Sequence, residues 1–155
     1  MSMKHKVMFV CSHNSARSQM AEGWLRHLAG DDFEVYSSGI EPGTLRPEAV
    51  TAMNEVGIDI SGQKAEGVSK YLGYVEVQYL VIVCAAAEKA CPAIWPGVIG
   101  RFFWDLPDPS AAQGSEEERL AVFREVRDQI REKMDPFIEQ IKADPLLKNT
   151  EVPAK

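Results

Sequence analysis

The sequence predicts an α/β fold, a small doubly wound sheet of four parallel strands with helices on both faces. Short apolar runs of strand length alternate with segments of helical periodicity, which is typical of strands joined by crossover helices. Two of these runs end at a cysteine, Cys11 and Cys84. Because ligands bind at the carboxyl ends of strands in such sheets, we expect the two thiols to lie at one site.

The first half of the chain predicts two strands and two helices. Residues 6–10 are nearly all apolar, as in a buried parallel strand, and residues 33–38 form a weaker second strand. Residues 19–28 have helical periodicity. Pro47 suits the first position of the next helix, where an N–H group would have no partner in any case. Residues 61–74 predict a loop with one short helix.

The second half predicts two more strands and a long final helix. Residues 79–84 give the strongest strand signal and are apolar on both faces, so this strand is expected to be central. Residues 85–90 are rich in alanine and favour a helix. Residues 101–104 predict the last strand. The capping box at residues 115–118 starts the long helix, which Pro136 should kink or restart.

The length of 155 residues predicts a single domain over residues 1–143 and a flexible tail over residues 144–155. The formal net charge of −6 argues against nucleic-acid and anionic-membrane partners, which need a basic face. No signal peptide is apparent, and no apolar run approaches the ~20 residues of a membrane helix. We therefore expect a cytoplasmic protein, and we expect it to be a monomer.

The stretch from Cys11 to Ser18 predicts a site for a tetrahedral oxyanion, because a cysteine and an arginine lie between a strand and a helix start. Backbone N–H groups of such a loop can point inward at an anion, and the helix N-terminus adds positive potential. Arg17 can hold two oxygens at once, and the same field favours a Cys11 thiolate that Ser18 can hydrogen-bond. The alternative is a buried strand-end cysteine and a surface arginine. The predicted oxyanion-binding residues are Ser12, His13, Asn14, Ser15, Ala16, Arg17 and Ser18.

Attack of a thiolate on an oxyanion also needs a proton donor, because oxide and hydroxide are poor leaving groups at neutral pH. Asp108 is the favoured candidate, since it is held in a rigid Pro-Asp-Pro frame after the last strand. Asp105 is the competitor. Both residues could instead be plain loop carboxylates.

Cys84 and Cys91 distinguish hydrolysis from redox chemistry. If residues 84–91 are helical, seven steps of ~1.5 Å place the two Cα atoms about 10 Å apart. A disulfide needs Cα atoms within roughly 7 Å, so the pair can bond only if this segment unwinds. One interpretation is two buried thiols without a role. The other is a relay in which Cys84 resolves an adduct on Cys11 and Cys91 then takes the disulfide.

The sequence resembles a known family over residues 6–141, the thioredoxin-coupled arsenate reductases built on the low-molecular-weight tyrosine phosphatase fold. The resemblance is carried by residues 11–24, by the Val-Tyr-Ser run at residues 35–37, and by two later cysteines seven positions apart. Trp104 and the Asp-Pro pair at residues 108–109 complete it. The combination with the two later cysteines is the most specific part.

The resemblance implies a three-cysteine cycle. Cys11 attacks arsenate, with Arg17 holding the oxyanion and Asp108 protonating a departing oxygen. Cys84 then releases arsenite and leaves a disulfide with Cys11, which Cys91 converts to a Cys84–Cys91 disulfide. Thioredoxin reduces that disulfide, with glutaredoxin or a low-molecular-weight thiol as alternatives. Phosphate and sulfate should bind as analogues, with weak phosphatase activity on phosphate esters.

The chain departs from the family in three places. His13 stands where many relatives have glycine, although only a backbone N–H is needed there. The alanines at residues 85–87 are more helical than the polar segment of relatives, so the last disulfide step should be slower. The third departure concerns a monovalent cation, which the resemblance allows as a bound ion although no tightly bound cofactor is expected. Its potassium site would use Asn14, Glu22, Ser37 and Glu66, the last in place of an aspartate.

Two alternative functions remain from the sequence. A true tyrosine phosphatase needs only Cys11, Arg17 and Asp108, but residues 110–113 lack the aromatic pair that usually frames a phosphotyrosine ring. A non-enzymatic oxyanion-binding or redox-sensing module would use the cysteines for regulation only. The complete set of nucleophile, oxyanion loop and acid argues against that second alternative.

Overall fold

Four parallel strands form one sheet in the computed structural model, which describes residues 4–91 and 95–143. The strand order is β2-β1-β3-β4, and every neighbouring pair is parallel. The predicted doubly wound α/β fold is therefore confirmed. The strands are β1 (His5–Cys11), β2 (Phe33–Gly39), β3 (Tyr79–Ile82) and β4 (Gly100–Phe103).

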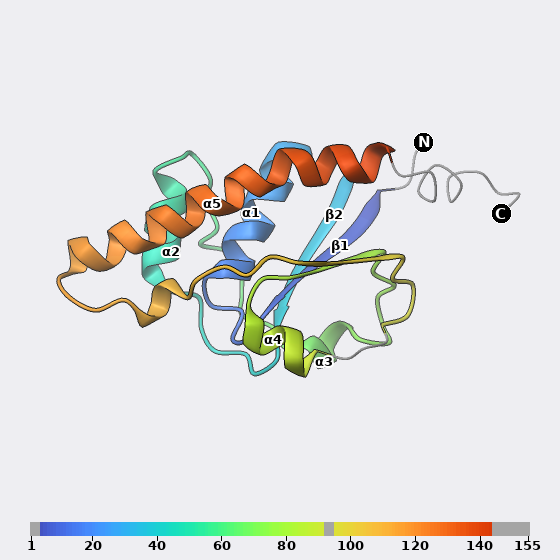
Figure 1. The fold of residues 1–155 in the computed structure, drawn as a ribbon, viewed down its shortest axis with the longest axis horizontal. Helices are drawn as coiled ribbons and strands as arrows, with labels where there is room; N and C mark the ends of the chain where they lie inside the picture. Colours follow the sequence, from blue (N-terminus) through green and yellow to red (C-terminus); the bar gives the residue numbers. More distant parts are fainter. Residues whose placement is uncertain (1–3, 92–94, 144–155) are drawn as a thin grey trace, which may run out of the picture.

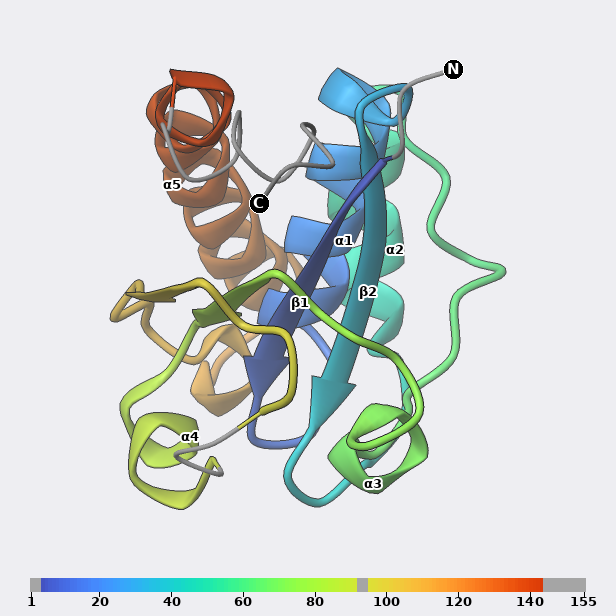
Figure 2. The ribbon, with the colours of Figure 1, turned by 90° about the vertical axis from the view of Figure 1, so that its right-hand side faces the viewer.

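Helices cover both faces of this sheet (Figures 1 and 2). The face that carries Phe9 and Phe102 packs against Phe137 of the last helix, with ring centroids 6.4 and 5.1 Å away. On the opposite face Tyr36 of β2 contacts Tyr71 at 5.4 Å. The helices are α1 (Arg17–Ala29), α2 (Pro47–Asn54), α3 (Val68–Tyr71), α4 (Ala85–Ala90) and α5 (Glu116–Ala143).

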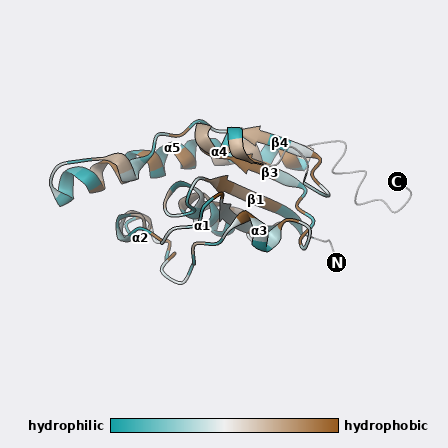
Figure 3. Ribbon diagram, turned by 90° about the horizontal axis from the view of Figure 1, so that it is seen from below, coloured by the Kyte–Doolittle hydropathy of each residue, from teal (hydrophilic) through white to brown (hydrophobic). Residues whose placement is uncertain are grey.

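The core lies between the sheet and the pair α1 and α5. All of Val7–Val10 is buried, because β1 is an inner strand with helices or loops over both of its faces. Figure 3 shows β1 as a strongly apolar strand in the middle of the molecule. Trp24 of α1 is 7% exposed, and its indole N–H donates to the carbonyl oxygen of Arg127 at 3.1 Å. α1 and α5 are thus fixed to each other as well as to the sheet.

α5 is one uninterrupted helix, so the interpretation that Pro136 restarts it is wrong, and a kink there stays a prediction. Met134 and Phe137 are buried on either side of the proline, and their packing holds the helix across the lost hydrogen bond. The predicted capping box is confirmed, since Ser115 and Glu118 exchange two hydrogen bonds of 3.1 Å. No helix within residues 4–91 and 95–143 is long and apolar enough to cross a membrane. The predicted tail at residues 144–155 lies outside the described residues.

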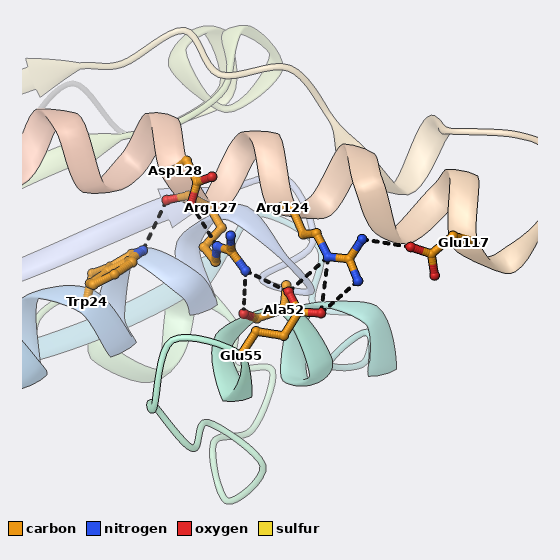
Figure 4. Close-up of polar contacts among 7 residues, drawn as sticks. All are labelled: Trp24, Ala52, Glu55, Glu117, Arg124, Arg127 and Asp128. Atoms are coloured by element: carbon orange, nitrogen blue, oxygen red, sulfur yellow. Dashed lines mark hydrogen bonds and ion pairs between the residues drawn. The ribbon is translucent and has the colours of Figure 1, made fainter.

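A cluster of charged side chains joins α2 to α5 (Figure 4). Arg127 is 9% exposed and donates to the carbonyl oxygen of Ala52 at 2.9 Å and to Glu55 at 2.8 Å. Arg124 lies nearly one turn earlier and binds Glu55 and Glu117. Hydrogen bonds from Arg124, and secondarily from Arg127, lower the pKa of Glu55. Through Arg127 the cluster supplies a hydrogen-bond donor to the carbonyl oxygen of Ala52, which lies in the last turn of α2 and has no partner within that helix.

Replacing Arg127 by alanine should lower the free energy of unfolding by about 2 kcal/mol, because a buried carbonyl group and a carboxylate lose a charged hydrogen-bond donor. Urea unfolding followed by circular dichroism measures the change. Arg124→Ala is the matched control and should cost less, since that side chain is one-third exposed. Equal losses in the two variants would contradict the role given to the buried guanidinium.

Candidate active site

The predicted oxyanion loop leads from the end of β1 to the start of α1, at the carboxyl edge of the sheet. It lies where the strand order reverses, between β1 and β3, which is where doubly wound sheets bind ligands. Figure 2 shows α3 and α4 beside the loop at this same edge. Three segments that are distant in the sequence therefore meet around Cys11, which is 2% exposed.

The backbone of the loop is turned by a second segment, residues 40–46. Its N–H groups donate to the carbonyl oxygens of Cys11, Ser12, His13 and Ser15, at 3.1, 2.8, 2.9 and 2.9 Å. Because these carbonyl groups point outward, the N–H groups that follow them in the chain face the inside of the loop. This is the arrangement of a backbone nest for an anion. The octet alone predicts the nest, but not the segment that holds it open.

The sulfur of Cys11 is placed inside this ring of donors. The N–H of Asn14 donates to it at 3.0 Å, and the hydroxyl of Ser18 lies 2.9 Å away. The side-chain amide of Asn14 donates to the Ser18 oxygen at 2.7 Å, which leaves the hydroxyl hydrogen to point at the sulfur. Two donors aimed at one sulfur stabilise its thiolate form. The expected contact between Ser18 and Cys11 is thus present.

Asn14 forms the tight turn of the loop and has a positive φ of 54°. Its side chain also donates to Ser37 at 2.9 Å and accepts from the N–H of Glu66 at 2.8 Å, which ties the loop to β2 and to the segment before α3. Asparagine tolerates this left-handed conformation better than most residues do. The turn is therefore stabilised by the hydrogen bonds of the buried Asn14 side chain, in a backbone conformation where glycine is the residue usually found.

Gly39, at the end of β2, supports the loop from behind. A Cβ atom at this position would lie 2.7 Å from the nitrogen of Asn14 and 2.7 Å from the carbonyl carbon of His13. Both are backbone atoms of the oxyanion loop and cannot move aside without distorting it. The sequence showed only a glycine closing a strand, so this role could not be predicted from it.

Gly39→Ala should weaken phosphate binding by tenfold or more while the protein stays folded, because the added methyl group displaces loop N–H donors. Binding can be measured as protection of Cys11 against alkylation by increasing phosphate. Gly62→Ala is the matched control, since a Cβ atom there meets nothing within 4 Å. Unchanged protection in Gly39→Ala would show that the loop tolerates the displacement.

Arg17 and Asp108 are brought together at the mouth of the loop. Arg17 is held by a hydrogen bond from Nη1 to the carbonyl oxygen of Leu106 at 3.1 Å, and its Nη2 lies 3.9 Å from Asp108. The other carboxylate oxygen of Asp108 accepts the N–H of Ser110 at 2.9 Å. Both aspartates considered from the sequence are exposed, and Asp108 is the one that lies within ion-pair distance of Arg17.

The remaining two cysteines lie at opposite ends of α4. Cys84 caps the helix N-terminus, with its sulfur accepting the N–H of Ala87 at 3.4 Å, and the same sulfur lies 3.3 Å from the hydroxyl of Ser12. Cys91 follows the last helical residue and is 7% exposed. The helix predicted over residues 85–90 is confirmed, and all three thiols are unpaired. A Cys84–Cys91 disulfide therefore requires α4 to unwind.

The residues of the potassium site implied by the resemblance already have protein partners. Glu22 pairs with Arg26, and Glu66 pairs with Lys70 at 3.0 Å, so both carboxylates are neutralised by resident side chains. The side-chain oxygen of Asn14 accepts the N–H of Glu66. Each of these three side chains thus already has an ion-pair or hydrogen-bond partner within the protein. Within residues 4–91 and 95–143, no group of three or more His, Cys, Asp or Glu is arranged to hold a metal ion.

The parallel sheet and the thiolate loop define a class of enzyme that forms covalent adducts with tetrahedral oxyanions. Residues 6–147 match the family model of the low molecular weight phosphotyrosine protein phosphatases, and the chain belongs to this family. Among its relatives are proteins named for a different reaction of the same site.

The chain is 45% identical over 139 residues to an arsenate reductase of Bacillus subtilis, covering 88% of this chain and 98% of that protein. It is 43% identical over 136 residues to an arsenate reductase of Halalkalibacterium halodurans, covering 88% and 96%. A solved structure of an arsenate reductase in the phosphate binding state superposes with a TM-score of 0.73 at 36% identity, covering 89% of this chain and 98% of that one.

Proposed function

We propose that this protein is an arsenate reductase in which Cys11, Cys84 and Cys91 act in sequence. The observation that carries the proposal is the position of Cys84, whose sulfur contacts Ser12 of the oxyanion loop at 3.3 Å. Hydrolysis of a phosphate ester requires no second thiol at this position. A thiol there can reach an adduct on Cys11, and a third thiol lies at the other end of the same helix.

The first step forms a bond between sulfur and arsenic. The Cys11 thiolate attacks the arsenic of arsenate, which the loop N–H groups and Arg17 hold by its oxygens. Asp108 gives a proton to a hydroxyl oxygen of the bound hydrogen arsenate, and that oxygen leaves as water. Asp108 is placed for this role at the mouth of the loop, 3.9 Å from the guanidinium group of Arg17.

The second and third steps carry two electrons out of the site. Cys84 attacks the sulfur of the adduct, the sulfur–arsenic bond breaks, and its electron pair stays on arsenic as arsenite leaves. Cys91 then attacks Cys84 in the Cys11–Cys84 disulfide, and Cys11 departs as a thiolate that the loop donors stabilise. The resulting Cys84–Cys91 disulfide accepts two electrons from an external dithiol, for which we propose thioredoxin.

The test is arsenate-dependent oxidation of NADPH with thioredoxin and thioredoxin reductase. We expect turnover that requires every component. Turnover only with glutaredoxin or a low-molecular-weight thiol would keep the reductase and replace its partner. Efficient hydrolysis of aryl phosphates without arsenate turnover would overturn the proposal in favour of a phosphatase.

Weak phosphatase activity is part of the same proposal, because the loop, Arg17 and Asp108 are complete for phosphate esters as well. The residues after Asp108 are small, and Pro109–Ala111 form a single helical turn. No aromatic side chain of that turn is available to frame a phosphotyrosine ring. We therefore propose that the substrates are small oxyanions. We also propose that the enzyme is a monomer and that it works in the cytoplasm, where reductants keep its thiols reduced.

We also propose that no monovalent cation binds between Asn14, Glu22, Ser37 and Glu66, since Arg26 and Lys70 neutralise Glu22 and Glu66. The Tm should be the same in potassium chloride and in choline chloride of equal concentration. A site filled at a hundred times its Kd would add about 2.7 kcal/mol of stability, which is several degrees in Tm. A potassium-specific rise in the Tm of the wild type would overturn this part of the proposal.

A further inference from the structure

An ion pair connects α4, the helix between Cys84 and Cys91, to the edge strand β4. Nη2 of Arg101 lies 3.6 Å from the carboxylate of Glu88. Phe102, the next residue, packs on Phe137 of α5, so Arg101 points to the opposite face of the sheet. In Figure 3 α4 is seen beside β4, in agreement with this ion pair between the two elements.

Glu88 and Cys91 are three positions apart at the C-terminal end of α4, so they share one side of the helix, and the guanidinium group that pairs with Glu88 also lies on the side of the Cys91 thiol. Burial raises the pKa of the Cys91 thiol, the charge of Arg101 and its hydrogen bond to the sulfur lower it, and the carboxylate of Glu88 raises it. Arg101 is therefore shared between a carboxylate and a buried thiol. Within residues 4–91 and 95–143, Arg101 of β4 and Glu88 of α4 are the charged groups that act on the Cys91 thiol.

We propose that Arg101 is a positioning residue for the last disulfide exchange, in which its guanidinium group stabilises the thiolate of Cys91 and Glu88 opposes it by holding that group. The inference rests on the proposed function, because the exchange is the third step of the relay. In that step the Cys91 thiolate attacks the sulfur of Cys84, the Cys11–Cys84 bond breaks, and Cys11 leaves with the electron pair. No net oxidation occurs, and the rate depends on the fraction of Cys91 present as thiolate.

An anchoring role for the ion pair gives a different expectation. If Arg101 only anchored α4 to the sheet through Glu88, then removing either partner would have the same effect on Cys91. If Arg101 acts on the thiolate, the two substitutions must act in opposite directions. Arg101→Gln removes the stabilising charge, whereas Glu88→Gln releases the guanidinium group to the sulfur. Arg101→Lys keeps the charge and should restore part of the effect.

Alkylation of Cys91 by iodoacetamide tests this without arsenate. In a Cys11→Ser, Cys84→Ser background Cys91 is the only thiol of the chain, which has three cysteines in all. The midpoint of the rate against pH should move up by about one unit in Arg101→Gln, which is tenfold less thiolate at neutral pH. It should move down in Glu88→Gln and stay unchanged in the control Lys89→Gln. Limited access to the buried sulfur scales every rate but does not move the midpoint.

The rates of arsenite release and of steady turnover provide a second, independent test. Without reductant, Arg101→Gln should release its first arsenite at the wild-type rate, because that step uses only Cys11 and Cys84. With thioredoxin, steady turnover should fall about threefold, because the tenfold loss of thiolate is partly offset by the higher nucleophilicity of a more basic sulfur. An unchanged midpoint in Arg101→Gln, or shifts of the same sign in both substitutions, would overturn the inference. Absence of arsenite release in the wild type would overturn the proposed function and leave the alkylation result standing.

Discussion

Cys84→Ser should release no arsenite above background even in a single turnover, whereas Cys91→Ser should release at most one arsenite per protein molecule. In the first variant the adduct on Cys11 forms, but no thiol can break the sulfur–arsenic bond. In the second variant arsenite leaves, but the disulfide stays between Cys11 and Cys84 and blocks the nucleophile. Arsenite measured against time, with and without thioredoxin, separates the two cases.

The fold should survive these substitutions, which makes the comparison a clean one. Serine is among the preferred residues at helix N-caps, so the hydroxyl introduced by Cys84→Ser would still accept the N–H of Ala87 at the start of α4. Cys91 lies at the other end of the helix, where its backbone N–H donates to the carbonyl oxygen of Ala87, a contact that Cys91→Ser keeps. Sustained turnover in both variants would contradict the relay, since one thiol would then suffice.

Arg17→Lys should lower the single-turnover rate of arsenite release by about 10²–10³-fold, the usual cost of losing one donor aimed at a developing oxyanion. Arg17 holds the carbonyl oxygen of Leu106 with one nitrogen and directs a second toward the mouth of the loop. A lysine has a single charged nitrogen and cannot do both. Phosphate should also protect Cys11 less well in this variant.

Arg46→Lys is the matched control for that experiment. Arg46 also lies against the oxyanion loop, with its N–H on the carbonyl oxygen of Ser15, but its side chain pairs with Glu48. The control should keep activity within a few fold of the wild type. A loss of similar size in both variants would mean that general positive charge, rather than the planar fork of Arg17, supports the reaction.

Local patterns were sufficient to predict most of the fold. Apolar runs located all four strands, and helical periodicity located α1, α2 and α5. β3 ends two residues earlier than predicted, because the apolar signal continues to Cys84 while the strand ends at Ile82. Cys84 leaves the sheet to cap α4, and a hydropathy pattern cannot distinguish the end of a strand from a buried cap. Pro136 failed as a break for a similar reason, since buried neighbours outweigh one lost hydrogen bond.

The candidate site also has features that the local sequence predicts and features that only the tertiary fold creates. The octet is continuous in sequence, so its thiol, its arginine and its nest could be predicted from spacing. Gly39 and residues 40–46 meet the loop only through the tertiary fold, and nothing in their local sequence marks them. The ion pair between Arg26 and Glu22 is another contact that the order of residues in the sequence does not show.

The measurement that tests the three-cysteine relay most directly is disulfide mapping after one turnover. The fully reduced protein is mixed with excess arsenate without a reductant, quenched with acid at increasing times, alkylated, digested and analysed by mass spectrometry. The relay predicts a Cys11–Cys84 disulfide that appears with arsenite and then decays as a Cys84–Cys91 disulfide accumulates. Arsenite release with Cys84 and Cys91 both still alkylatable would contradict it.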